Sequence, residues 1–264
     1  CNGISRPLND SEIINVNIHD GGYDHFDHPI YAGGDNVLVE GSRFHHWTGY
    51  GIQLRTPGYP SSNWVIRNNI SYDNDASGIV LVTGGNHLVY NNLIYGNNGG
   101  ILMFAASHKI YNNTIVNNNK NGAGAGIYIN SGDASTVEIK NNINYGNNGG
   151  AILVDTTGTP IQSHNLTSDP RVINPSAFDF HLRSDSPAIN AGMTIPEVPC
   201  DFDGNKRPAG SAYDIGAYEY GSSPGGKCGG SGGREGGITP SPSPSGISFT
   251  ASPSSITSSG TSQL

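Results

Sequence analysis

Short apolar stretches alternate with Asn- and Gly-rich bends along most of this chain, and no window keeps the apolar spacing of an amphipathic helix. Gly and Asn are poor helix formers, so runs such as GNNGG at 96–100 predict very little helix. The doublet Asn-Asn recurs at 68–69, 91–92, 112–113 and 141–142, after 23, 21 and 29 residues. Such a period is typical of a chain that coils into a stack of repeats.

Each period contains three short apolar stretches. The first places an apolar residue two positions before the doublet: Ile66, Val89, Ile110 and Ile139, with Leu38 two positions before Glu40-Gly41, which we take as a degenerate earlier copy. The second has, at a fixed place after the doublet, Phe44, Tyr72, Tyr95, Val116 and Tyr145, and the third begins at Ile30, Ile52, Ile79, Ile101, Ile127 and Ile152. Three strands per turn predict an all-β chain, a parallel β-helix of about six coils with three parallel sheets.

Stacking makes this pattern physically reasonable. Each residue lies ~4.8 Å above its counterpart in the next coil, so like residues form columns. We expect Ile66, Val89, Ile110 and Ile139 to be buried in one column, and the tyrosines of the second stretch in another. Asn suits the bends because it tolerates left-handed backbone angles and its amide bonds along the ladder. A β-sandwich with Asn-rich turns would not return identical doublets in register with the apolar columns.

Two parts of the chain resemble known proteins. Residues 13–168, most clearly HPIYAGGDNVLVEG at 28–41 and the Asn-Asn coils, resemble the right-handed parallel β-helix repeat proteins of bacterial secretomes, related in architecture to pectate lyases. Residues 169–220 resemble the C-terminal region of the choice-of-anchor group, through SPAINAG at 186–192, DFDGNKRP at 201–208 and DIGAYEY at 214–220. These resemblances imply a right-handed coil and a secreted or cell-surface bacterial protein.

Composition divides the chain into four parts. We expect a β-helix over 1–168, an irregular C-terminal capping segment over 169–220, and a Gly/Ser/Pro-rich linker over 221–246. Residues 247–264 alternate like the start of a truncated immunoglobulin-like module. Cys200 and Cys228 are positioned to form a disulfide around the C-terminal segment, if the fold brings them together.

Charge excludes one class of partner. The net charge is −8, with 13 Lys and Arg that are scattered along the chain, so nucleic acid has no basic stripe to bind. The sequence contains no run of about 18 apolar residues, so it predicts no transmembrane segment. The expected partner is polysaccharide, with cell-surface association through additional domains.

Polar chemistry concentrates between residues 19 and 55. By resemblance to polysaccharide lyases, which hold an acidic sugar through calcium or basic side chains while a base removes a proton, Arg55 is a candidate base or carboxylate clamp. The other catalytic candidates are His25, His28, His45 and His46; the substrate-binding candidates are Tyr31, Gln53 and Trp47. We expect Arg55 and the histidines to line one shallow groove. Calcium is a possible cofactor, although DFDGN at 201–205 is better interpreted as a turn, because position 212 is Ala instead of the Glu of a calcium loop.

Two functions from different classes fit this sequence. One is an enzyme, a lyase or less favourably a hydrolase, that cuts an acidic extracellular polysaccharide. The other is a non-catalytic surface protein whose stack displays a ladder for glycan contact. The sequence also leaves an outward apolar stripe in the third stretch, Val80, Val82, Leu102 and Phe104, which we expect residues 169–220 to cover, unless it serves as a glycan groove.

Overall fold

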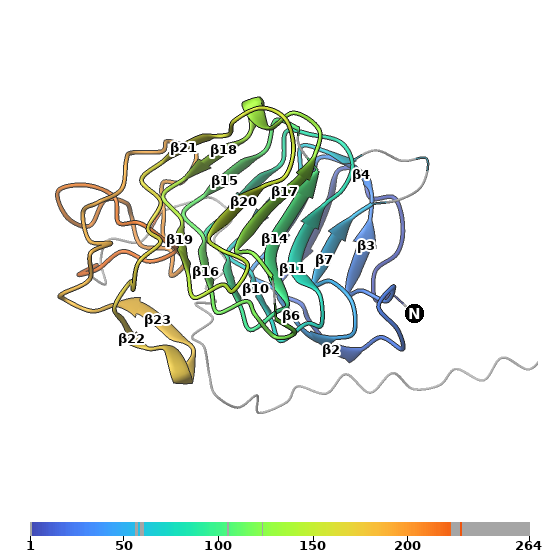
Figure 1. Ribbon diagram of the computed structural model, residues 1–264, viewed down its shortest axis with the longest axis horizontal. Helices are drawn as coiled ribbons and strands as arrows, with labels where there is room; N and C mark the ends of the chain where they lie inside the picture. Colours follow the sequence, from blue (N-terminus) through green and yellow to red (C-terminus); the bar gives the residue numbers. More distant parts are fainter. Residues whose placement is uncertain are drawn as a thin grey trace, which may run out of the picture.

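A computed structural model describes residues 2–55, 58, 61–104, 106–122, 124–222 and 228. Most of the expected linker over 221–246, and all of 247–264, lie outside the described residues. The described chain is a right-handed β-helix of about six coils, built from short parallel strands (Figure 1). No helix in these ranges is long and apolar enough to cross a membrane.

Three parallel sheets form the walls of the stack. Sheet I contains β1 (Ser11–Ile14), β5 (Val37–Glu40), β9 (Val65–Arg67), β12 (Leu88–Tyr90), β15 (Lys109–Tyr111), β18 (Glu138–Lys140) and β21 (Ile161–Ser163). Sheet II contains β2 (Asn17–Gly21), β6 (Arg43–Trp47), β10 (Ile70–Tyr72), β13 (Leu93–Tyr95), β16 (Thr114–Val116) and β19 (Ile143–Tyr145). Sheet III contains β3 (Ile30–Ala32), β7 (Ile52–Leu54), β11 (Ser77–Leu81), β14 (Gly99–Phe104), β17 (Ile127–Ser131) and β20 (Ile152–Val154).

The remaining elements are short. A two-stranded parallel ladder joins β4 (Gly34–Asp35) and β8 (Ser61–Ser62), and an antiparallel pair joins β22 (Val172–Asn174) and β23 (Asp179–Leu182). Two single 3₁₀ turns, η1 (Ala134–Thr136) and η2 (Pro175–Ala177), complete the described elements. Every pairing within the three sheets is parallel, as the repeat predicts.

The first predicted column is confirmed. Ile66, Val89, Ile110 and Ile139 pair in register in sheet I and are completely buried. In the earlier coil, however, Val39 occupies this column instead of Leu38. The offset arises because Gly41-Ser42, one position later than expected, takes the place of the Asn doublet: the Ser42 amide donates to Asn69 Oδ1 at 3.0 Å.

The tyrosine column was predicted on the wrong side of its sheet. Tyr72 and Tyr95 pair in register in sheet II but belong to its outer face, because it is Ile94, one position away, that packs in the core of the stack. Tyr95 is nevertheless buried, since the C-terminal segment covers it, whereas Tyr145 is 37% exposed. In the second coil His45, not Phe44, occupies the column, and Phe44 is in the core.

Two ladders of buried asparagines hold the bends. The second Asn of each doublet accepts at Oδ1 from the backbone and side-chain amides of its counterpart in the preceding coil; Asn92 accepts from Asn69 at 3.0 and 3.1 Å. This ladder is formed by Asn69, Asn92, Asn113, Asn142 and Asn165, and a second by Asn74, Asn97, Asn118 and Asn147. Each amide bonds both along the stack and to a backbone carbonyl, so these polar groups are satisfied where water is excluded.

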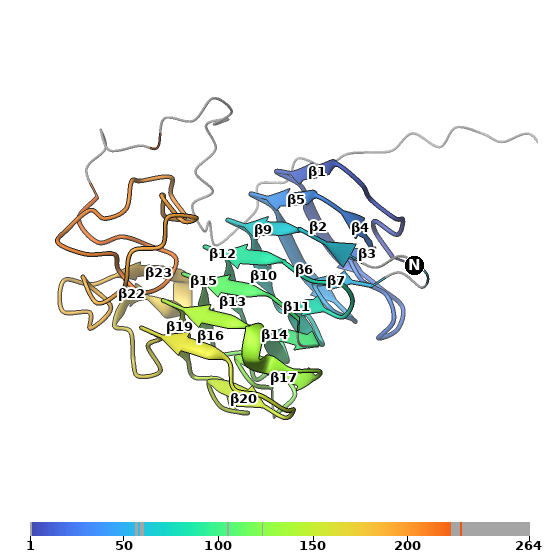
Figure 2. The ribbon, with the colours of Figure 1, turned by 90° about the horizontal axis from the view of Figure 1, so that it is seen from above.

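The C-terminal segment packs against the side of the stack, over sheets I and II (Figure 2). The first Asn of three doublets, each with a positive φ, presents its amide to this segment: Asn91 donates to Cys200 O, Asn112 to Asp214 O, and Asn141 to Met193 O.

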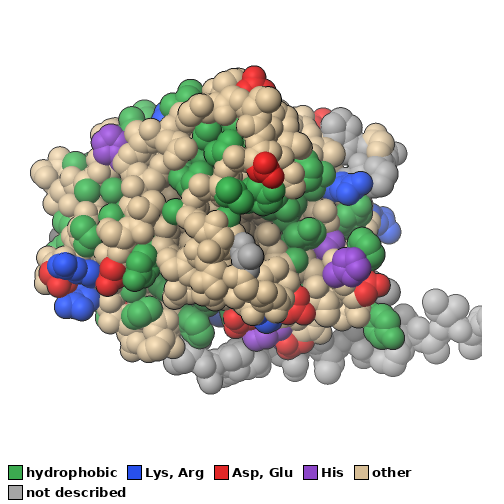
Figure 3. Space-filling model, in the orientation of Figure 1, with side chains coloured by type: hydrophobic (Ala, Val, Ile, Leu, Met, Phe, Trp, Pro, Cys, Tyr) green, Lys and Arg blue, Asp and Glu red, His purple; other side chains and the backbone are tan. Residues whose placement is uncertain are grey.

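The prediction that residues 169–220 cover the apolar stripe of sheet III was therefore wrong, because the segment covers sheets I and II instead. Val80 is buried, whereas Val82, Leu102 and Phe104 stay partly exposed. Figure 3 shows hydrophobic side chains gathered over sheet III around β14 and β17.

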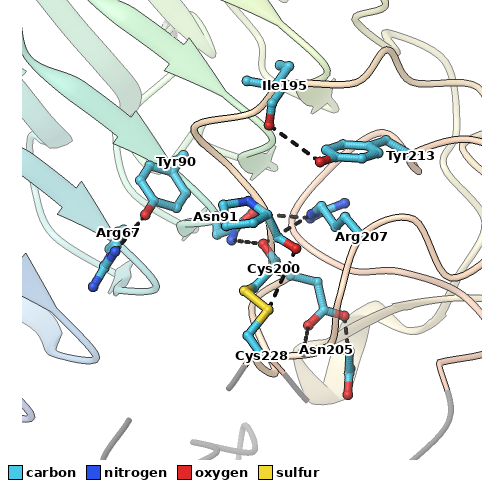
Figure 4. The surroundings of a disulfide bond; sticks show 11 residues. Arg67, Tyr90, Asn91, Ile195, Cys200, Asn205, Arg207, Tyr213 and Cys228 are labelled. Carbon is cyan, nitrogen blue, oxygen red and sulfur yellow. Dashed lines mark hydrogen bonds between the residues drawn. A yellow bond between two sulfur atoms is a disulfide. The ribbon is translucent and has the colours of Figure 1, made fainter. Parts of the chain in front are cut away.

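The sequence motifs of the C-terminal segment have a structural role. Arg207 is buried, pairs with Glu219 at 2.7 Å, and donates to Asn91 Oδ1 at 3.1 Å, which fastens the segment to the stack (Figure 4). Asp201 accepts from the Asn205 amide at 2.7 Å, so DFDGN forms a turn, as expected. A disulfide joins Cys200 to Cys228 beside this network.

Candidate functional site

The densest group of exposed ionisable side chains lies at the bend between sheets II and III in the first three coils. Asp20, His46 and Asp73 occupy equivalent positions there, each with φ between 53° and 56°. Later coils place Gly96, Asn117 and Gly146 at this position. We call Asp20, His46 and Asp73 the corner row. Figure 3 shows acidic, basic and histidine side chains gathered along the lower edge, beneath β6 and β10.

His46 lies between two carboxylates. Its Nδ1 is 3.8 Å from Asp20 Oδ1, and its Nε2 is 3.8 Å from Asp73 Oδ2. His19 Nδ1 is 2.7 Å from the other oxygen of Asp20, and His45 Nδ1 is 2.6 Å from His46 Nδ1. About half of the His46 side chain is exposed, so these groups are open to a ligand.

The two carboxylates of the corner row have different environments. The hydrogen bond with His19 lowers the pKa of Asp20. Burial raises the pKa of Asp73, against the opposing charges of His46 and Lys120. Asp73 therefore takes up a proton more readily than Asp20, a difference that acid–base sites commonly exploit.

Two of the predicted catalytic histidines are instead structural. His45 is buried, its ring stacks between those of His19 and Tyr72, and burial lowers its pKa to about 4. His28 is also buried; its Nδ1 accepts from the Tyr50 amide at 2.9 Å, and burial lowers its pKa to about 4. Both rings are neutral near pH 7 and face protein instead of solvent.

A protruding loop over residues 22–29, between β2 and β3, stands beside the corner row. Its own side chains fix its shape: Asp24 Oδ1 accepts from the Phe26 amide at 2.8 Å, and Asp27 Oδ2 from the Tyr23 amide at 2.7 Å. Tyr23 is 95% exposed and Phe26 is 69% exposed, while His25 packs against Phe26 with ring centroids 3.8 Å apart. The loop thus holds two aromatic rings in solvent on an ordered backbone.

Trp47 lies at the base of this loop. Its ring packs on Gly21, where an added Cβ would be 2.3 Å from the indole, so only glycine fits. Trp47 is only 6% exposed, yet among the described residues its indole Nε1 has no hydrogen-bond partner. A buried indole N–H normally has an acceptor, so this donor is left unsatisfied in the structure.

At the other end of the corner row, the long bend of the fifth coil folds back along the stack. Lys120 Nζ is 2.8 Å from Asp75 Oδ1 and donates to Asp73 O at 2.8 Å. The corner row is therefore bounded by loop 22–29 at the first coil and by Lys120 at the third.

The remaining predicted site residues lie on a different face. Tyr31 and Gln53 pair in register on the outer side of sheet III, and Arg55 is exposed just after β7. Tyr31 contacts His28, with ring centroids 5.7 Å apart, but His45 and His46 belong to sheet II. The single groove that we expected to join Arg55 with these histidines is not formed, because coil stacking aligns residues one period apart only within the same sheet.

Sequence reasoning missed Asp73, Lys120, Tyr23 and Phe26. A signal existed for Asp73, which lies 27 residues after His46, one period of the repeat. For the two aromatics the signal was the length of the bend between His19-Asp20 and Ile30, which is longer than in the next coils. No group of three or more His, Cys, Asp or Glu in the described ranges is arranged to hold a metal ion, so calcium stays a prediction with no ligand set to support it.

Comparison with known proteins agrees with this architecture. The family model described as right-handed beta helix region matches residues 2–167. No curated protein matches the chain by sequence. Among solved structures, the crystal structure of pectate lyase Pel9A is similar at 12% identity and a TM-score of 0.45, over 83% of this chain and 69% of that one. The chain belongs to the right-handed β-helix family.

Proposed function

We propose that this protein binds an extracellular polysaccharide at the corner row and loop 22–29. The observation that carries the proposal is the pair Tyr23 and Phe26, which a hydrogen-bonded loop holds 95% and 69% exposed beside Asp20 and His46. Sugars pack their C–H faces on aromatic rings while polar side chains bond their hydroxyl groups. Large exposed aromatics on a fixed backbone are otherwise unfavourable, so a partner is their simplest explanation.

The other aromatic row of the molecule suits a sugar less well. His19, His45, Tyr72 and Tyr95 stack face to face along sheet II, with successive centroids 4.4 to 5.1 Å apart. Their faces are therefore occupied by one another, and the Phe178 ring stacks on Tyr95. Tyr23 and Phe26, the two most exposed aromatic residues of the described ranges, instead present much of their ring surface to solvent, with His25 against one side of Phe26.

Secretion belongs to the same proposal. The disulfide between Cys200 and Cys228 supports it, because such bonds persist mainly in oxidising compartments. A bacterial cell-surface or extracellular location would place the stack where polysaccharides occur.

Cleavage of the bound glycan is the second candidate function. It is favoured by the contrast between Asp20, whose pKa is lowered, and Asp73, whose pKa is raised, on either side of His46. Asp20 would act as base and Asp73 as acid. A lyase centred on Arg55 has less support, since His28 and His45 are buried and His46 lies on sheet II, which leaves only His25 of the candidate histidines exposed outside that sheet.

Affinity electrophoresis tests binding directly. The parent protein is run in native gels, each of which contains one neutral, acidic or amino-bearing polysaccharide. The variants Tyr23→Ala and Phe26→Ala and the control Tyr145→Ala are run beside it. Tyr145 is a suitable control because it is exposed at the far end of the stack. We expect at least one polysaccharide to retard the parent and the control, and each loop variant to bind roughly fivefold more weakly, since an aromatic contact contributes ~1 kcal/mol.

Two results would contradict the proposal: no retardation by any polysaccharide, or equal retardation of the loop variants and the parent. Release of reducing ends or of unsaturated products from the retarding glycan would establish cleavage. If binding occurs with no product, the non-catalytic display function is the correct one.

A further inference from the structure

We propose that this site selects a glycan that carries amino groups, a polymer of cationic amino sugars, in preference to an acidic uronate polymer. The inference rests on the proposed function and adds the chemical class of the ligand. It departs from the acidic substrate that the sequence suggested.

The first argument is the charge around the loop. Three carboxylates lie in this region: Asp20 and Asp73 on the corner row, and Asp24 on the loop that carries the aromatic rings. Lys120, at the far end of the corner row, is already paired with Asp75 at 2.8 Å. The chain as a whole has a net charge of −8. A uronate polymer would approach like charges, whereas an ammonium-bearing sugar would approach opposite ones.

The aromatic rings favour the same sign of charge. The face of an aromatic ring is the negative part of its quadrupole, so it attracts an ammonium group and repels a carboxylate. Tyr23 and Phe26 present their rings with 95% and 69% of their surface exposed. Rings and carboxylates on the same loop therefore act together on a cationic sugar.

Trp47 is the independent sign that a ligand belongs here. Its buried indole N–H lacks an acceptor among the described residues and lies at the base of loop 22–29, where the ring packs on Gly21 beside Asp20. A sugar hydroxyl or ring oxygen is the kind of acceptor that such a donor requires. An ammonium group has no acceptor to give, whereas an amino sugar carries both a cation for the carboxylates and oxygens of the kind that an indole N–H requires.

Arg55 offers the contrast within the same molecule. It is an exposed cation just after β7 of sheet III, away from the corner row, where an acidic sugar would find an opposite charge. The corner row with loop 22–29 should therefore prefer a cationic glycan, and the face that carries Arg55 an acidic one. The glycan that binds most tightly reports which face binds it.

The experiment measures affinities of the full chain by titration calorimetry at neutral pH and low salt for three probes: chitosan oligomers, their fully N-acetylated equivalents, and oligogalacturonate. We expect chitosan oligomers to bind about tenfold more tightly than the acetylated probe, and oligogalacturonate to bind weakest. Raising the salt to about 0.5 M should remove most of this preference, because the Debye length then falls well below 10 Å.

Paired variants assign the preference to the carboxylates. Asp20→Asn with Asp73→Asn should reduce the ratio of chitosan affinity to acetylated-probe affinity by about fivefold or more, since each exposed ion pair contributes up to ~1 kcal/mol. The matched control is Asp155→Asn, an exposed carboxylate on the last coil, which should leave the ratio unchanged. Circular dichroism checks that the double variant keeps its β structure.

The outcomes separate the two proposals. Tighter binding of oligogalacturonate, or an unchanged ratio in the double variant, would overturn the amino-sugar inference while glycan binding stands. Equal affinity for an oligolysine of the same charge would overturn it too, because the site would then recognise charge without sugar. If none of the glycans binds, both the inference and the proposed function are wrong.

Discussion

Acid should weaken this fold through a pair of buried histidines. His87 and His108 precede β12 and β15 at the bend between sheets III and I, and their rings stack with centroids 4.9 Å apart. Both are essentially unexposed. Burial lowers the pKa of His87 to about 4 and that of His108 to about 3, so both rings are neutral in the folded state.

The magnitude follows from proton linkage. The unfolded chain binds a proton at each imidazole as the pH falls through 6.5, whereas the folded chain does not until the pH is near 4 for His87 and 3 for His108. Because the unfolded state binds more protons in that window, stability is full above pH 6.5 and falls as the pH is lowered. Between pH 8 and pH 5 each histidine costs about 2 kcal/mol, so the pair costs about 4 kcal/mol.

Urea unfolding at the two pH values measures this loss, and His108→Phe isolates one contribution. Phenylalanine keeps a ring against His87 and cannot titrate, and among the described residues the Nδ1 of His108 has no hydrogen bond to lose. We expect the variant to lose about 2 kcal/mol less than the parent between pH 8 and pH 5. Comparing losses removes the contributions of the other ionisable groups. Equal losses in parent and variant would refute the reasoning.

Three substitutions test the packing of the fold. Asn92→Ala removes a ladder amide that bonds Asn69, Ile66 O and Asn113, and should lower the free energy of unfolding, measured in urea, by about 3 kcal/mol. The control Asn119→Ala, at a part-exposed position, should lower it by less than about 0.5 kcal/mol. Arg207→Met leaves buried Glu219 unpaired and should cost about 3–5 kcal/mol and speed proteolysis of the C-terminal segment, with partial recovery on adding Glu219→Gln. Cys228→Ser should lower stability by about 2–4 kcal/mol, and a reductant should lower the parent equally. Unchanged unfolding midpoints would contradict each of these.

Much of the stack could be predicted from the sequence because the repeat is strict where packing is strict. Asn92 and Asn113 recur with the period because only an amide both accepts and donates along the ladder, and Ile66 and Val89 recur because their column has no space for a polar group. The second coil broke the rule, since Ser42 replaces the ladder Asn there, and the alignment slipped by one residue.

Orientation and coverage were harder to predict. A three-residue strand leaves the direction of its middle and end residues undecided by alternation alone, so Tyr72 and Tyr95 were assigned to the interior. Their apolar surface is buried by a segment more than 80 residues later, which no local pattern indicates. For the same reason, the prediction that the C-terminal segment covers sheet III was wrong.

The site was only partly predictable. His19 and His45 lie one repeat period apart and pair in register, but the period could not say that Arg55 belongs to another sheet from these rings. Burial decided the rest: the rings of His28 and His45 are held by hydrogen bonds and stacking that depend on other coils. The density of polar residues therefore indicated the coils of the proposed site but not the face on which it lies.

Hydrogen exchange with and without a saturating glycan tests the central claim most directly, because it reports which face of the stack the ligand covers. The account predicts slower exchange in peptides that contain residues 20–29 and 45–48, with residues 52–55 and 127–131 of sheet III unchanged. Protection confined to sheet III would contradict it and would move the binding site to the face that carries Arg55.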